Sequence, residues 1–100
     1  MKKAEKIFNS AYAECRVYAK KNGTKRREDG SASGFNSIIN EGTISVRTLN
    51  EVQKLINSEK KNIAVCAELG MLDADMLKVK DYAIDMVQAT LDNTRKVLVR

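Results

Sequence analysis

Apolar residues near the start of the chain recur at three- and four-residue spacing, the pattern of one buried helix face. The repeat predicts a helix over residues 2–22. It consists of Ala4, Phe8, Ala11, Cys15, Tyr18 and Ala19, and Ile7 and Tyr12 widen the face. Asn22 and Gly23 follow, and either residue can adopt the left-handed conformation that ends a helix. The pattern therefore indicates an amphipathic helix that stops at Asn22-Gly23.

The next segment loses this periodicity. Residues 23–36 contain three of the five glycines, two serines and five charged residues, so few of them can enter a core. This composition predicts a flexible loop. Phe35, Ile38 and Ile39 then predict a short helical turn within residues 35–41.

A second helix is predicted over residues 45–69, where periodicity returns. Its apolar stripe consists of Leu49, Val52, Ile56, Ile63, Cys66 and Gly70, with Glu59 as a polar position inside the stripe. Thr43 and Ser45 can both cap its start, and Thr48 with Glu51 has capping-box spacing. The start therefore lies between Thr43 and Thr48. A break near Asn57-Ser58 is the alternative to one continuous helix, because Ser58 can cap a new start.

The third helix follows a connection of only a few residues, 70–73. Asp73 is the predicted N-cap, and Asp75 suits the positive end of the helix dipole. Its apolar residues form two adjacent stripes: Met76, Val79, Ala83, Met86, Thr90 and Val97, flanked by Ile84, Val87, Leu91 and Leu98. The short connection predicts an antiparallel hairpin. The expected fold is an all-α bundle of three long helices in a single domain over residues 1–100.

The breadth of the apolar face on the third helix exceeds what one neighbouring helix covers. Long helices bury their faces poorly in a thin bundle, and Glu59 places a charge in a seam. We therefore expect a homodimer. The residues predicted for its interface are Met86, Val87, Thr90, Leu91 and Thr94.

Composition argues against catalysis. The chain has no histidine, which removes the side chain that titrates nearest neutrality and the commonest metal ligand. We expect no enzymatic activity, metal or cofactor. Two isolated cysteines, Cys15 and Cys66, fit a reduced chain and core packing. No apolar run reaches the length of a membrane span, and the basic N-terminus lacks the apolar region of a signal peptide, so we expect a cytoplasmic protein and no membrane partner.

The net charge of +5 arises entirely within residues 1–34, which hold nine Lys or Arg and four Asp or Glu. The expected function is a non-enzymatic interaction or regulatory module that acts as a homo-oligomer. The alternative is nucleic-acid binding, because basic side chains that neutralise phosphates release counterions. The candidate residues are Lys20, Lys21, Lys25, Arg26 and Arg27, with Arg47 and Asn50 from the second helix. The competing interpretation is a solvated helix end, since Glu28 and Asp29 offset part of the charge.

Two other motifs are present only in part. Residues 35–56 have the gross shape of a helix-turn-helix, but the first helix is too short and Ile38 occupies the position that needs a small residue. Asp73 and Asp75 begin like a calcium loop, yet the sixth position is Lys78 and the twelfth is Ile84. These acids are better explained as a helix cap.

Three segments carry a family resemblance: Lys3 to Phe8, Val46 to Asn50 and Thr90 to Lys96. They resemble segments of small uncharacterised helical proteins found in bacterial prophages and other mobile elements. The resemblance implies a bacterial cytosolic setting. It favours interaction or regulation over metabolism and assigns no functional residues.

Overall fold

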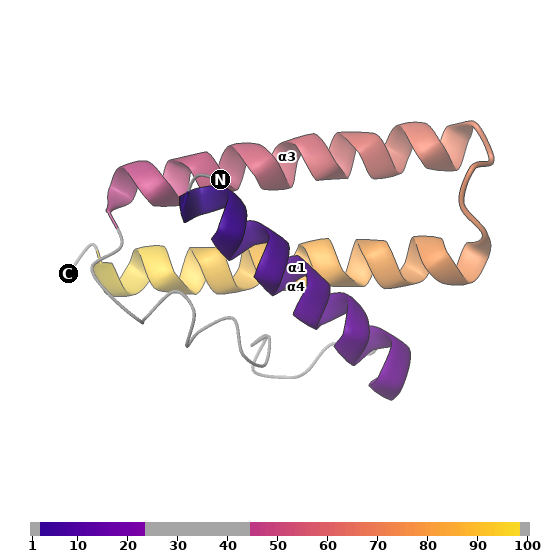
Figure 1. Cartoon of the computed structure of the whole chain (residues 1–100), viewed down its shortest axis with the longest axis horizontal. Coiled ribbons are helices and arrows are strands. Elements are labelled where there is room, and N and C mark those ends of the chain that lie inside the picture. The colour runs from indigo at the N-terminus through magenta and orange to yellow at the C-terminus, as the bar shows by residue number, and fades with distance from the viewer. Residues whose placement is uncertain (1–2, 24–44, 99–100) are drawn as a thin grey trace.

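The structure is a computed structural model that describes residues 3–23 and 45–98, with side chains up to residue 95. Three helices make up almost all of these ranges: α1 (Lys3–Asn22), α3 (Val46–Glu68) and α4 (Ala74–Leu98). Figure 1 shows α3 and α4 running side by side in opposite directions, with α1 crossing them obliquely. All three helices pack against one another. The predicted all-α bundle of three long helices is confirmed.

The C-terminal end of α1 and the start of α3 follow from local backbone chemistry. Gly23 adopts a φ of 85°, and its N–H donates to the carbonyl of Ala19 at 2.9 Å, which ends α1 where the sequence predicts. Ser45 is the N-cap of α3, and its Oγ accepts from the Thr48 N–H at 3.2 Å. The start of α3 is therefore set by Ser45. The helix then continues without a break through residues 57–58.

A tight turn joins α3 to α4. The N–H of Met71 donates to the Cys66 carbonyl at 2.9 Å, and the N–H of Gly70 donates to the Ala67 carbonyl at 3.2 Å. Gly70 has a φ of 68°, so this is the Schellman arrangement that satisfies the last carbonyls of a helix. Asp73 then caps α4, because its Oδ1 accepts from the Met76 N–H at 2.7 Å.

The core lies where the three helices meet. It is formed by Ala4, Ile7, Phe8, Ala11, Tyr12, Cys15 and Ala19 from α1, by Leu49, Val52, Ile56 and Ile63 from α3, and by Tyr82, Ala83, Ile84, Met86, Val87 and Leu91 from α4. The predicted apolar faces of α1 and α3 account for their share. Both stripes of α4 contribute, because this helix packs against two neighbours.

This packing corrects the predicted dimer interface. Val87, Thr90 and Leu91 are fully buried within one chain, and Met86 and Thr94 are nearly so. The hydroxyl of Thr90 donates to the Met86 carbonyl at 3.0 Å, and that of Thr94 donates to the Thr90 carbonyl at 2.9 Å. These five residues are therefore covered inside the bundle and are not accessible to a second copy.

Candidate interaction surface

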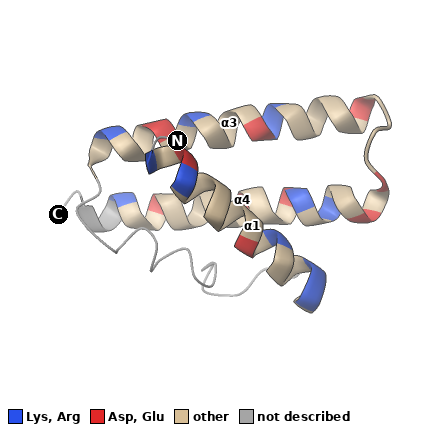
Figure 2. Ribbon diagram, in the orientation of Figure 1, with Lys and Arg blue, Asp and Glu red and all other residues tan. Residues whose placement is uncertain are grey.

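The structure separates the residues that the sequence suggested for nucleic-acid binding. Lys20 and Lys21 are exposed on the last turn of α1, where Figure 2 shows basic residues gathered at the free end of the helix. Arg47 and Asn50 are exposed in the first turns of α3. Figure 1 places the end of α1 and the start of α3 at opposite ends of the molecule. These two pairs therefore do not form one patch.

Arg47 and the hydroxyl groups beside it already have partners within the start of α3. Arg47 lies 3.7 Å from Glu51 on the next turn, and its side chain is 90% exposed. Ser45 and Thr48 are occupied in capping α3, with their hydroxyl oxygens 3.0 Å apart. The other three candidates, Lys25, Arg26 and Arg27, lie outside the described residues, as do the predicted turn at 35–41 and all of the predicted 23–36 loop except Gly23.

An open groove runs between α3 and α4 near their shared turn, with a volume of about 460 Å³. Its apolar part is formed by Ile63, Ala64, Ala67, Leu77 and Ile84. The two isoleucines are buried and Leu77 is half-buried, whereas both alanines are exposed. The described residues that line the groove come only from α3 and α4, so α1 does not cover it.

Charged side chains border this groove. Lys60 stands on the α3 side, and Asp81 and Asp85 stand on the α4 side. Lys60 and Asp81 are exposed. The groove thus combines an apolar floor with charges of opposite sign on its two edges. An apolar centre with a polar rim is the usual composition of a surface that contacts another protein.

This groove was not predicted from the sequence, although three of its residues are visible in the sequence as apolar positions outside the predicted core. Ala64, Ala67 and Leu77 are apolar residues outside the stripes that were assigned to the core. Their position on a common cleft depends on how α3 and α4 pair, which the spacing within either helix does not reveal.

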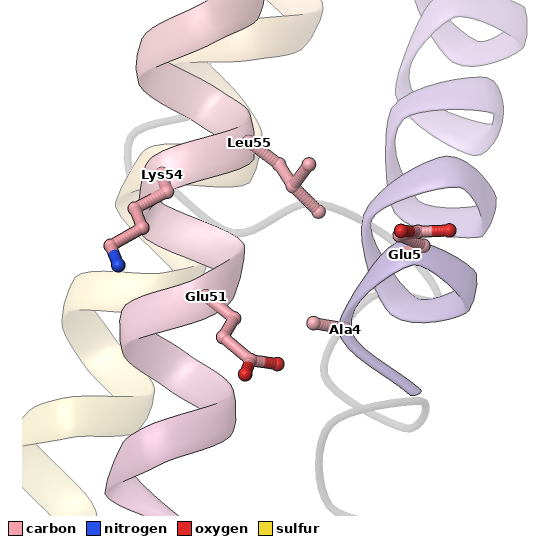
Figure 3. Close-up of a pocket in the computed structure, with 5 residues that line it drawn as sticks. All are labelled: Ala4, Glu5, Glu51, Lys54 and Leu55. Atoms are coloured by element: carbon pink, nitrogen blue, oxygen red, sulfur yellow. The ribbon is translucent and has the colours of Figure 1, made fainter. Parts of the chain in front are cut away.

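A smaller cleft of about 240 Å³ separates the start of α1 from α3. Figure 3 shows Leu55 and Glu51 extending from α3 toward Ala4 on α1, while Lys54 points away from α1. Glu5 completes the lining. The Glu51 carboxylate lies next to Arg47, so its charge is already partly balanced at this site.

A polar cluster on α1 explains the charged position in the α3 seam. The Arg16 guanidinium carbon lies 4.6 Å from the centre of the Tyr12 ring, a cation–π contact. Burial raises the pKa of the Tyr12 phenol, and the neighbouring Glu59 carboxylate raises it further. No hydrogen bond of standard geometry from the described residues reaches Tyr12 Oη or Arg16 Nε. Glu59 thus faces a polar part of α1.

The remaining aromatic and sulfur groups serve packing. Tyr18, a member of the predicted apolar face of the first helix, stacks on Tyr82 with ring centres 6.4 Å apart. Cys15 is buried and Cys66 is half-buried, and both are free thiols. Burial raises the pKa of the Cys15 thiol from its ordinary value of 9.0 to about 11. A thiol with a raised pKa is a poor nucleophile at neutral pH.

Within residues 3–23 and 45–98, no group of three Cys, Asp or Glu side chains is placed to hold a metal ion. In the same ranges, no helix combines the length and apolar character needed to cross a bilayer. No protein-family model, curated protein or solved structure matches the chain.

Proposed function

We propose that this protein is a non-enzymatic interaction module that associates with a second copy of itself. The observation that carries the proposal is the groove between α3 and α4, where the exposed Ala64 and Ala67 and the half-buried Leu77 present apolar surface that α1 does not cover. Covering this exposed part of the groove removes it from water and so favours association. The resemblance to helical proteins of bacterial mobile elements favours a regulatory role for such a module.

Sedimentation velocity between about 5 and 500 µM tests this proposal, because weak complexes of small surfaces form in this range. We expect the weight-average mass to rise from the monomer value of 11.2 kDa toward twice that value. A single species of monomer mass across the whole range would overturn self-association.

The alternative function is nucleic-acid binding at the end of α1. The observation that favours it is the exposure of Lys20 and Lys21 on the last helical turn, four residues before the basic residues at positions 25–27. Phosphate contacts by such side chains weaken as salt concentration rises. Arg47 and Asn50 belong to the first turns of α3, at the other end of the molecule from the end of α1 (Figure 1), so the proposed contact uses the end of α1 alone.

Fluorescence anisotropy of a labelled random DNA duplex, at low and physiological salt, tests the alternative. We expect micromolar binding by the wild-type protein that weakens as the salt concentration rises. The K20E/K21E variant should bind more weakly, and its affinity should depend less on salt concentration. The matched control is Lys54→Glu, which reverses an exposed charge on α3. Equal DNA binding by the K20E/K21E variant and the wild-type protein would rule out the end of α1 as the binding site.

A further inference from the structure

The groove between α3 and α4 has charges arranged so that it complements itself. Lys60 lines its α3 side and Asp81 lines its α4 side, and both side chains are exposed. Both residues border the same groove, so they lie at a similar level along the hairpin. One groove therefore offers a positive edge and a negative edge that run parallel to each other.

We propose that the groove is occupied by the same groove of a second copy, related by a two-fold axis that runs along the hairpin. This inference rests on the proposed function, and it specifies the surface and the orientation. Symmetric interfaces of this type use the same patch on both copies. The product is a parallel arrangement of two α3–α4 hairpins, with α1 of each copy outside the contact.

The charges select this axis over the alternative. Rotation about an axis along the groove brings α3 of each copy over α4 of the other, so Lys60 meets the partner's Asp81. Rotation about an axis that crosses the groove at the level of Lys60 would bring α3 over α3 and set Lys60 near the partner's Lys60. Juxtaposed like charges suppress an orientation, whereas opposite charges fix it. The parallel arrangement forms the attractive pair twice.

The apolar residues of the groove fit the same contact. Ala64 and Ala67 are small and exposed on α3, so they allow the partner's α4 to approach closely. Leu77 of α4 packs against the core of its own chain but is only half-buried there, so the exposed part of its side chain is available to the partner. The charged pairs then set the orientation, and Ala64, Ala67 and Leu77 supply the apolar contact.

Charge reversal in two separate variants provides the test. Lys60→Glu places a glutamate opposite the partner's Asp81, and Asp81→Lys places a lysine opposite the partner's Lys60. Each variant alone should dimerise about tenfold more weakly than wild type, because both attractive pairs become repulsive. An equimolar mixture of K60E and D81K regains both attractive pairs. The mixture should therefore form a heterodimer with affinity close to that of the wild-type dimer.

Sedimentation velocity with one variant labelled measures the heterodimer directly, and circular dichroism confirms that each variant is folded. The matched control is Lys61→Glu, which reverses the neighbouring exposed charge outside the groove. Its dimerisation should equal that of wild type. As a second route, Ala64→Glu places a bulky charge at an exposed position in the groove and should also weaken the dimer.

The outcomes separate the two proposals. A wild-type dimer that K60E, D81K and A64E all leave unchanged would overturn the groove interface, while self-association itself would stand. Weakening by each single variant without recovery in the mixture would overturn the parallel orientation. A wild-type chain that remains monomeric would overturn both the interface and the proposed function.

Discussion

Two titratable side chains on the buried face of α1 resist ionisation. Cys15 is 3% exposed and Tyr12 is 6% exposed, and burial raises the pKa of both groups. In each case the charged form would lose its hydration inside the core. Because Glu59 and Glu14 are carboxylates near Tyr12 and Cys15 respectively, they raise these pKa values further.

These shifts predict that the free energy of unfolding falls at alkaline pH. The Cys15 thiol ionises near 9 in the unfolded chain and near 11 in the folded chain, so the unfolded state releases its proton first. The stabilisation is fully present below pH 9 and is lost as pH rises toward 11. For Cys15 we expect a loss of about 1 kcal/mol by pH 10, measured by urea unfolding. The raised pKa of Tyr12 acts in the same direction at higher pH.

Removal of each cysteine in turn checks the assignment. Cys15→Ala should flatten the decline in the free energy of unfolding between pH 8 and 10, because no thiol then ionises on unfolding at that position. Cys66→Ala, which leaves the buried thiol in place, should retain the wild-type slope. An unchanged slope in Cys15→Ala would assign the alkaline instability to other groups.

At the scale of the elements, the α3–α4 hairpin depends on a few local devices. Beyond the turn, a paired amide contact links its two helices: Gln53 Nε2 donates to Gln88 Oε1 at 2.7 Å, and Gln88 Nε2 donates to Gln53 Oε1 at 2.8 Å. Two hydrogen bonds between the same side chains constrain the register of α3 against α4. That register brings Lys60 and Asp81 to the two edges of one groove.

Gly70 is the turn residue with the clearest expected cost of substitution. An added Cβ would meet no atom within 4 Å, so the cost of Gly70→Ala comes only from its φ of 68°. We expect a loss of about 1 kcal/mol in the free energy of unfolding, measured by urea denaturation. Gly70→Asn should lose less, since asparagine tolerates the left-handed conformation better. Equal losses for both variants would contradict this explanation.

At the scale of the whole molecule, one core shared by three helices makes the fold cooperative. The described helices pack pairwise in all three combinations, and α1 contributes a continuous buried face to the core. The α3–α4 hairpin therefore relies on α1 to cover much of its apolar surface. A change in α1 should consequently affect the whole bundle.

Phe8→Ala tests this cooperativity. Phe8 is 8% exposed and packs 5.5 Å from the Tyr12 ring, so its truncation should cost about 3–5 kcal/mol. Loss of helical circular dichroism and exposure of the Cys66 thiol on α3 should follow one urea transition. The control Val17→Ala changes a residue that is 62% exposed and should shift the transition little. A Phe8→Ala variant with two separate transitions would show that the hairpin folds without α1.

Most of the fold was predictable because its signals are local. Helix ends follow from Gly23, Ser45, Gly70 and Asp73, whose backbone and side-chain chemistry acts within a few residues. The candidate site was not predictable in the same way. Arg47 and Lys20 look like parts of one basic surface along the sequence, but the crossing of α1 over the hairpin separates them.

By itself, the sequence determined three amphipathic helices, their ends and the antiparallel hairpin, since periodicity, caps and short connections act over a few residues. Only the tertiary structure decided how the broad face of α4 was shared. Packing against both α1 and α3 buried Thr90 and Leu91 inside one chain and left the groove at Ala64 and Leu77 open. The spacing of apolar residues along a helix shows how much of its surface must be covered. The way the other helices cross it decides which residues cover that surface.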